Sequence, residues 1–342
     1  MHQVDFDPSI FSEASSKTVI ITGGANGIGA ATALLFNKHG ANVVIADLRS
    51  FEKNAETLIA TFPHPECGVF LPANILDWGQ MIALFKGTVQ RFGGIDIVIA
   101  NAGIMESHTV LGLDDLDEEG DLRESKEGFK VIDVNLKGTL NTLRLAMHHM
   151  KSKQTPSGSV VLLASTSGYF GGTGVSAYVA SKHGVVGLLR ASQATAQQHG
   201  IRVNAIAPFF TPTRITAGFA RSWEEAGLEA NTPQRVAESI VQMAVDSSKK
   251  GACLLVSDEK IDVINIPTCR SDMRFLIPGC REISKRNGVD EGEIAPNMAG
   301  RRCFRLYESS RAVLRGYWRL CAAKAELNCT LPRHTSNLSP QL

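Results

Sequence analysis

Short apolar runs rich in β-branched residues alternate with longer segments of helical periodicity along residues 15–266 of this 342-residue chain. This alternation is the feature that most restricts the fold, because parallel strands need crossover connections, which helices supply. Several runs are apolar throughout, as expected of strands that helices cover on both faces. The pattern predicts an α/β fold with a doubly wound, seven-stranded parallel sheet in a single domain.

The predicted elements account for nearly all of the chain between residues 15 and 266. The expected strands are 18–21, 42–46, 68–71, 95–100, 159–163, 202–206 and 252–256. The expected helices are 29–38, 78–92, 129–151, 177–198 and 233–246. The acidic segment 114–127 lies outside the pattern, and we expect it to be a solvated loop or the exposed start of a helix.

Composition excludes several classes of protein. The chain is 44% hydrophobic and 20% charged, which is typical of a folded globular protein. Its net charge of +1 provides no field that would attract nucleic acid. No apolar run reaches the ~18–20 residues needed to cross a bilayer, and the polar N-terminus does not resemble a secretory signal. We therefore expect a cytoplasmic protein with no membrane span and no nucleic-acid partner.

The last part of the chain differs in kind from the rest. Residues 1–266 carry 22 Lys and Arg against 27 Asp and Glu, whereas residues 267–342 carry 13 against 7. The last segment also holds five of the seven cysteines, none at zinc-ligand spacing, so no metal site is expected. We expect 267–342 to be a basic, Cys-containing tail, poorly ordered or partly helical at 303–325. A genuine appendage and a mispredicted gene end both fit this composition.

A glycine-rich turn follows the first strand. The sequence Thr22-Gly-Gly-Ala-Asn-Gly-Ile-Gly29 runs from that strand into the first helix. Its glycines allow a tight turn, close approach of the backbone to a diphosphate, and close packing of the helix on the strand. The helix N-terminus adds N–H groups and the positive end of its dipole. This context predicts a Rossmann-type dinucleotide site formed by Gly23, Asn26, Gly27, Ile28 and Gly29.

The second strand ends at Asp47, eighteen residues after Gly29. An acid at about this distance binds the adenosine ribose in dinucleotide sites. Its carboxylate accepts hydrogen bonds from the ribose hydroxyls and repels a 2′-phosphate, and Arg49 is the only base close by in the sequence. The sequence therefore favours NAD over NADP. No Gly-Lys-Ser/Thr closes the turn, so it is not a phosphate-binding loop of an NTPase.

Tyr178 and Lys182 are predicted to share one face of a helix, since they are four residues apart. A tyrosine is a weak base at neutral pH, and a nearby ammonium lowers the pKa of its phenol toward working pH. Ser165 stands at the end of the fifth expected strand, where active sites of open α/β sheets gather. Its hydroxyl is placed to hold a substrate oxygen beside the phenol.

These motifs, in this order and spacing, resemble the short-chain dehydrogenase/reductase superfamily over about residues 15–266. The resemblance implies catalytic roles for Ser165, Tyr178, Lys182 and Asn135, the last as part of a proton relay through water. It also implies cofactor contacts from six further residues and from the catalytic pair Tyr178 and Lys182. The six are Asn74, Ile75, Asn101, Ala102, Gly103 and Thr213.

The chain departs from the family where Phe209 follows Pro208, a position normally held by glycine. A phenylalanine there would reshape the approach to the nicotinamide. Together with Phe170 and Phe210, it also indicates an apolar pocket beside an expected lid at 214–232. Segments 113–122 and 251–256 look similar to the hydroxyprostaglandin-dehydrogenase-like branch, including members in fungal secondary metabolism. The expected substrate is therefore a lipophilic secondary alcohol or ketone of polyketide, terpenoid or steroid-like type.

Two other functions stay open at this point. One is a catalytically weak dinucleotide-binding sensor or scaffold, which the intact catalytic residues disfavour. The other is an NADPH-dependent ketoreductase, which Asp47 disfavours. The resemblance further implies a homodimer or homotetramer, assembled through the expected helices 129–151 and 177–198.

Overall fold

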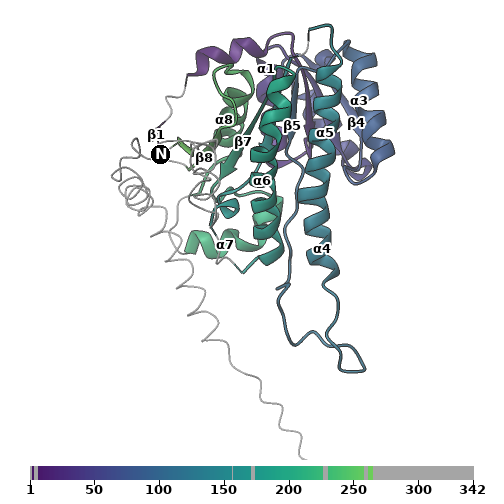
Figure 1. Ribbon diagram of the computed structural model, residues 1–342, viewed down its shortest axis with the longest axis vertical. Coiled ribbons are helices and arrows are strands. Elements are labelled where there is room, and N and C mark those ends of the chain that lie inside the picture. Colours follow the sequence, from purple (N-terminus) through teal and green to yellow (C-terminus); the bar gives the residue numbers. More distant parts are fainter. Residues whose placement is uncertain are drawn as a thin grey trace, which may run out of the picture. The chain divides into compact units, whose positions relative to one another are not determined.

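A computed structural model describes residues 2–3, 7–155, 157–170, 174–225, 230–257 and 261–264 (Figure 1). The expectations for the tail 267–342, its helix at 303–325 included, lie outside these residues. Residues 221–228 belong to a second compact unit. The structure describes its residues 221–225, which form the end of helix α7 (Ala217–Glu225). Within it Arg221 pairs with Glu225 at 2.8 Å.

The parallel sheet predicted from the alternating pattern is confirmed. Its strands run in the order β1-β9-β8-β7-β6-β5-β2-β3-β4. The seven strands from β2 to β8 are mutually parallel, and β9 and β1 extend the sheet antiparallel beyond β8. The strands are β1 His2–Gln3, β2 Thr18–Thr22, β3 Asn42–Asp47, β4 Gly68–Pro72, β5 Ile97–Ala100, β6 Gly158–Leu163, β7 Ile201–Pro208, β8 Cys253–Val256 and β9 Ile261–Ile264.

Among the residues that the structure describes, the seven expected parallel strands are all present, and the two antiparallel pairings of β9 and β1 extend the sheet to nine strands. The two additional strands are short, and β9 follows β8 antiparallel after only a brief connection. The sequence pattern did not predict either strand. An antiparallel strand needs no crossover helix before it, and a two-residue strand such as β1 is too short to show a hydrophobic period.

Helices cover both faces of the sheet (Figure 1). The α-helices are α1 Gly27–Lys38, α2 Glu52–Ala60, α3 Trp78–Phe92, α4 Lys126–Ile132, α5 Thr139–Lys151, α6 Ser176–Gln198, α7 Ala217–Glu225 and α8 Pro233–Val245. One buried cluster joins α3, α5 and α6 to one face of the strands, and a second joins α1 and α8 to the other. Alternate strand residues enter opposite clusters: Ile20 and Val44 the first, Val19 and Val43 the second.

The single helix expected at 129–151 is interrupted. A π-helical turn, Asp133–Gly138, separates α4 from α5. Asn135 lies within this turn and is fully buried. Gly138 packs so closely on Ile75 that a Cβ on Gly138 would lie 2.3 Å from the Ile75 side chain. Such π-turns occur frequently at functional sites, and here the turn carries a residue predicted to be catalytic.

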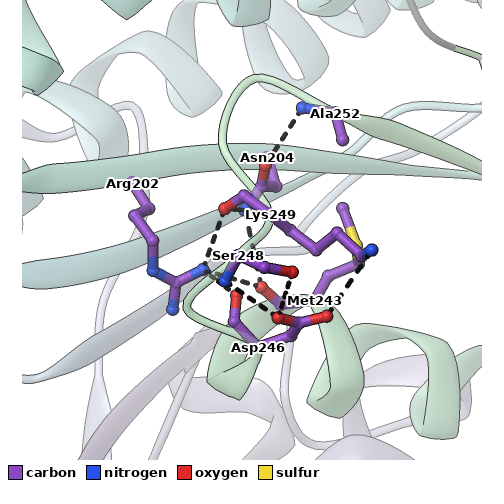
Figure 2. Close-up of polar contacts among 7 residues, drawn as sticks. All are labelled: Arg202, Asn204, Met243, Asp246, Ser248, Lys249 and Ala252. Atoms are coloured by element: carbon purple, nitrogen blue, oxygen red, sulfur yellow. Dashed lines mark hydrogen bonds and ion pairs between the residues drawn. The ribbon is translucent and has the colours of Figure 1, made fainter.

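An arginine fixes the end of α8 against β7 (Figure 2). The Arg202 guanidinium donates to the carbonyl oxygens of Met243 (3.2 Å), Asp246 (2.9 Å) and Lys249 (3.2 Å). Asn204 donates to the carbonyl of Lys249 at 3.0 Å beside it. The last carbonyls of a helix have no partners within the helix, so a cation at this end satisfies them and complements the dipole.

We expect Arg202→Met to destabilise the protein by about 2–4 kcal/mol, because it leaves several partly buried carbonyls without donors. Thermal unfolding monitored by circular dichroism measures the change. The matched control is Arg221→Met. The Arg221 side chain is 91% exposed and pairs with Glu225 of its own helix in the described part of the chain, so the melting temperature of this variant should stay near that of the wild type. Equal melting temperatures for the two variants would contradict the assignment.

Candidate active site

The residues predicted from the sequence to form the site all follow the carboxyl ends of parallel strands or lie on helices beside them. The glycine-rich turn follows β2, Asp47 ends β3, and Asn74 follows β4. Asn101 follows β5, and Ser165 follows β6. Ligand sites of open α/β sheets form at this edge, where the strand order reverses between β2 and β5.

The turn after β2 requires glycine for two reasons. Gly23 has a φ of +65°, and a Cβ there would lie 2.8 Å from the Cα of Ala102. A Cβ on Gly29 would lie 2.1 Å from the carbonyl oxygen of Gly23. Gly23 N donates to Ala46 O at 2.8 Å, which ties the turn to β3. Only glycines allow the backbone to close this tightly.

The turn presents the N-terminus of α1. Helix α1 starts at Gly27, and its N-cap residue, Asn26, makes no side-chain cap; the Asn26 side chain instead accepts from Asn54 at 3.3 Å. Thr213 approaches from the segment after β7, with its methyl carbon 3.3 Å from where a Gly27 Cβ would be. Ile28 packs on the core below. The N-terminus of α1 is lined by glycines, so a dinucleotide diphosphate fits against its N–H groups.

Asp47 is held beside the turn. Its carboxylate accepts from Leu48 N (2.8 Å) and Ala25 N (3.1 Å). Burial raises the pKa of Asp47, and these two hydrogen bonds and the charge of Arg214 oppose that rise. The Arg214 guanidinium lies 5.0 Å from the centroid of the Phe51 ring. Arg214 therefore faces the same carboxylate, a neighbour that the sequence does not reveal because it is far along the chain.

Asn101 binds the turn to β5. Its side-chain amide donates to the carbonyls of Thr22 and Gly23, both at 2.9 Å. The backbone N–H groups of Asn101 and Ala102 donate to the Thr22 hydroxyl at 3.1 and 3.2 Å. The segment after β5 thereby fixes the position of the glycine-rich turn.

Asn74 forms a local turn after β4. Its side-chain oxygen accepts from Leu76 N at 3.0 Å, and its own N–H donates to Gln80 at 2.9 Å. Ile75 is buried against the π-helical turn, and its carbonyl accepts from Asn141 at 3.0 Å. The two residues predicted to contact the cofactor thus follow the end of β4 and are held by these hydrogen bonds.

Ser165 and Tyr178 meet at the end of β6. The Ser165 side chain is buried, accepts from Ser167 N at 3.1 Å, and is hydrogen-bonded to Tyr178. Burial raises the pKa of Tyr178; the bond from Ser165 lowers it, and the nearby Glu106 raises it. The net direction is opposite to that expected from a neighbouring lysine, because burial has the larger effect.

Lys182 lies behind the phenol. Its Nζ is 5.5 Å from the centroid of the Tyr178 ring and donates to the carbonyl of Leu163 at 2.7 Å. The side chain is 4% exposed, and burial lowers its pKa to about 8. A Cβ on Gly103 would lie 3.7 Å from this Nζ, so the glycine leaves the amine close to the segment after β5.

Asn135 connects that segment to α6. Its side chain accepts from Ile104 N and donates to Ile104 O, both at 2.8 Å, and donates to the Ser181 hydroxyl at 3.0 Å. Its carbonyl accepts from Thr139 at 2.7 Å. The carboxamide therefore has a clear positioning role, and the proton relay stays a prediction from the family resemblance.

Phe209 is accommodated by extended pairing rather than by a left-handed turn. Its N–H donates to Val256 O at 2.8 Å, which continues the pairing of β7 with β8. Among the described non-glycine residues only Ser16 has a positive φ, so the phenylalanine needs no glycine-like conformation. Its side chain and that of Phe210 are partly exposed.

The residues that the structure describes contain neither a membrane-spanning helix nor a cluster of metal ligands. None of their helices is sufficiently long and apolar to span a bilayer. They contain no group of three or more His, Cys, Asp or Glu side chains arranged to hold a metal ion. Cys67 and Cys253 are free thiols.

Comparison with known proteins gives consistent matches. A family model described as short chain dehydrogenase matches residues 17–224. The short-chain dehydrogenase/reductase prx4 of Penicillium roqueforti is 36% identical over 230 residues, 67% of this chain and 65% of prx4. The chain thus spans slightly less than two thirds of that relative. (+)-Borneol dehydrogenase 1 of Salvia officinalis is 35% identical over 212 residues, 61% of this chain and 75% of that protein.

Solved structures support the fold independently. A short-chain type dehydrogenase/reductase from Mycobacterium marinum superposes with a TM-score of 0.62 at 25% identity. The match covers 72% of this chain and 96% of that one.

Proposed function

The chain belongs to the short-chain dehydrogenase/reductase family, and from this we propose that it is an NAD(H)-dependent oxidoreductase that interconverts a secondary alcohol and a ketone. The observation that carries the proposal is the hydrogen-bonded pair Ser165 and Tyr178 with the buried Lys182 behind it. This group stands at the same edge of the sheet as the glycine-rich turn. Proton-transferring and dinucleotide-binding residues are thereby gathered in one place.

A nicotinamide dinucleotide held by the glycine-rich turn and Asp47 would supply the hydride acceptor in oxidation and the hydride donor in reduction. Tyr178 takes the proton of the substrate hydroxyl in oxidation and returns one to the ketone oxygen in reduction. Ser165, already bonded to the phenol, holds the substrate oxygen next to it. The Lys182 amine, 5.5 Å from the centroid of the Tyr178 ring, would favour the phenolate when it is protonated, and Asn135 fixes the helix that carries both residues through Ser181.

Asp47 supports the choice of NAD. Its carboxylate is fixed by two backbone N–H groups beside the turn, where the adenosine ribose would bind. A 2′-phosphate there would meet a negative charge. Arg214 and Arg49 are the features that keep an NADPH-dependent ketoreductase as the second candidate, since guanidinium groups bind phosphate.

The proposed substrate is a lipophilic alcohol of polyketide, terpenoid or steroid-like type. The partly exposed Phe170, Phe209 and Phe210 follow the ends of β6 and β7 and support this class. One relative is named for borneol, a bicyclic terpenoid alcohol, and another relative is from a fungus. A cytoplasmic homodimer or homotetramer remains part of the proposal, supported by the exposed apolar side chains of Phe129 and Leu140 on α4 and α5.

The test is NADH formation from NAD⁺ with a panel of lipophilic secondary alcohols, with NADP⁺ in parallel. Turnover with NAD⁺ supports the proposal, and turnover with NADP⁺ alone would favour the ketoreductase. NADH binding without turnover across the panel would favour a dinucleotide-binding sensor or scaffold.

Replacing Ser165 by alanine is expected to lower kcat/KM by about 10²-fold, because the hydroxyl that orients the phenol and the substrate oxygen is lost. Steady-state kinetics at saturating NAD⁺ measures the effect. Ser167→Ala is the matched control, since Ser167 donates to Ser165 through its backbone N–H, which this substitution keeps. Wild-type kinetics in the Ser165 variant would remove this serine from the mechanism.

A further inference from the structure

Glu106 is a buried carboxylate that belongs to none of the sequence motifs. It follows β5 and is 3% exposed. One carboxylate oxygen accepts from Ala177 N at 2.9 Å and the other from Tyr178 N at 3.0 Å. We propose that Glu106 is a positioning residue that holds the first turn of α6, and with it the phenol of Tyr178, in the orientation needed for proton transfer. This proposal rests on the function proposed above.

Helix α6 needs such a partner at its start. Its N-cap residue, Val175, has an apolar side chain and provides no cap. The first N–H groups of a helix have no acceptors within the helix, and a buried start without acceptors is costly. A carboxylate at this position satisfies two of these donors and is stabilised by the positive end of the dipole. Glu106 therefore caps the helix from a distant segment.

The placement of Glu106 connects the catalytic helix to the rest of the site. Within the same short segment, Asn101 holds the Gly23 carbonyl of the cofactor turn and Ile104 holds Asn135 of the π-helical turn. Glu106 adds the start of α6 to this set. One segment thus sets the relative positions of the dinucleotide turn and the phenol. Displacements of about 1 Å between such groups cost on the order of 10²-fold in rate.

The charge of Glu106 provides a signature that a purely structural role would lack. In the part of the chain that the structure describes, Glu106 and Lys182 are the charged groups placed against Tyr178. After burial, the Glu106 carboxylate raises the pKa of the phenol. Removing the charge should therefore make the phenol easier to deprotonate while loosening the helix start.

The experiment compares Glu106→Gln with the wild type in alcohol oxidation as a function of pH. We expect kcat to fall at least about tenfold from lost alignment, with the KM for NAD⁺ nearly unchanged, and the acid limb of the profile to move to lower pH. Asp7→Asn is the matched control, because Asp7 is a carboxylate that caps the short helical segment Pro8–Ala14 by accepting from Ser9 N at 2.9 Å. It should leave both kcat and the acid limb unchanged. An unchanged kcat, or an unmoved acid limb, in Glu106→Gln overturns the proposal.

A second variant and a second readout keep the proposal testable if Glu106→Gln folds poorly or if the proposed function is wrong. Glu106→Asp keeps the charge but is too short to reach both N–H groups, so it should lose rate without moving the acid limb downward. Amide hydrogen exchange at Ala177 and Tyr178 needs no turnover and should speed up in both variants. An inactive wild type would refute the proposed function alone. Unchanged exchange at these two amides would refute the capping role whatever the activity.

Discussion

Tyr178→Phe should lower kcat for alcohol oxidation by about 10³-fold or more, because phenylalanine cannot accept or donate the proton that accompanies hydride transfer. The ring remains, so its packing over Lys182 persists and NADH binding should stay near that of the wild type. Steady-state rates measure the first effect, and fluorescence titration with NADH measures the second.

Tyr169→Phe is the matched control. Its hydroxyl lies by Cys253 rather than among the residues of the proposed mechanism, and burial raises its pKa far above the ordinary value. It should retain wild-type turnover. If Tyr178→Phe retained turnover as well, the assignment of this tyrosine as the proton-transferring residue would be wrong.

The second large effect concerns the cofactor. Asp47→Ala should shift the ratio of kcat/KM for NAD⁺ over NADP⁺ by about 10²-fold toward NADP⁺, because a repulsive charge costs several kcal/mol next to a 2′-phosphate. The ratio is read from initial rates with each cofactor at the same alcohol concentration. An unchanged ratio would mean that Asp47 does not face the ribose.

Arg214 provides the internal control for this change. Its guanidinium acts on Asp47 and lies over Phe51, so it is the base best placed to meet a phosphate once the carboxylate is gone. Adding Arg214→Ala to the Asp47 variant should therefore cancel much of the gain with NADP⁺. Arg49→Ala, whose side chain is 75% exposed and pairs with Glu52, should cancel less.

The sheet and the glycine-rich turn could be predicted because local sequence determines them. Strand β2 is buried throughout and enters a turn that requires glycine, because a Cβ at Gly23 or Gly29 would lie 2.8 or 2.1 Å from a backbone atom. Helix α3 starts and ends where the sequence predicts, between Asp77, which caps it, and Gly93, which has a φ of +81°. Such signals depend on neighbours within a few residues, so they can be recognised in the sequence before the fold is known.

Long-range contacts could not be predicted from the sequence. The Tyr178–Lys182 spacing predicts a shared helix face, but it does not reveal that burial raises the pKa of Tyr178 and lowers that of Lys182 to about 8. Glu106 has no motif, and Arg214 is assigned to a lid by its position. Both acquire a role only because strand ends meet at one edge of the sheet.

The sequence by itself determined the order of the elements and the glycine-rich turn, and it selected the serine, tyrosine and lysine of the candidate site. These follow from periodicity and from steric limits on the backbone, which act locally. Tertiary structure alone decided the π-helical turn at Asn135, the carboxylate of Glu106 at the start of α6 and the guanidinium of Arg214 beside Asp47. The physical reason is that burial and charge depend on which segments fold together, and no local pattern records that choice.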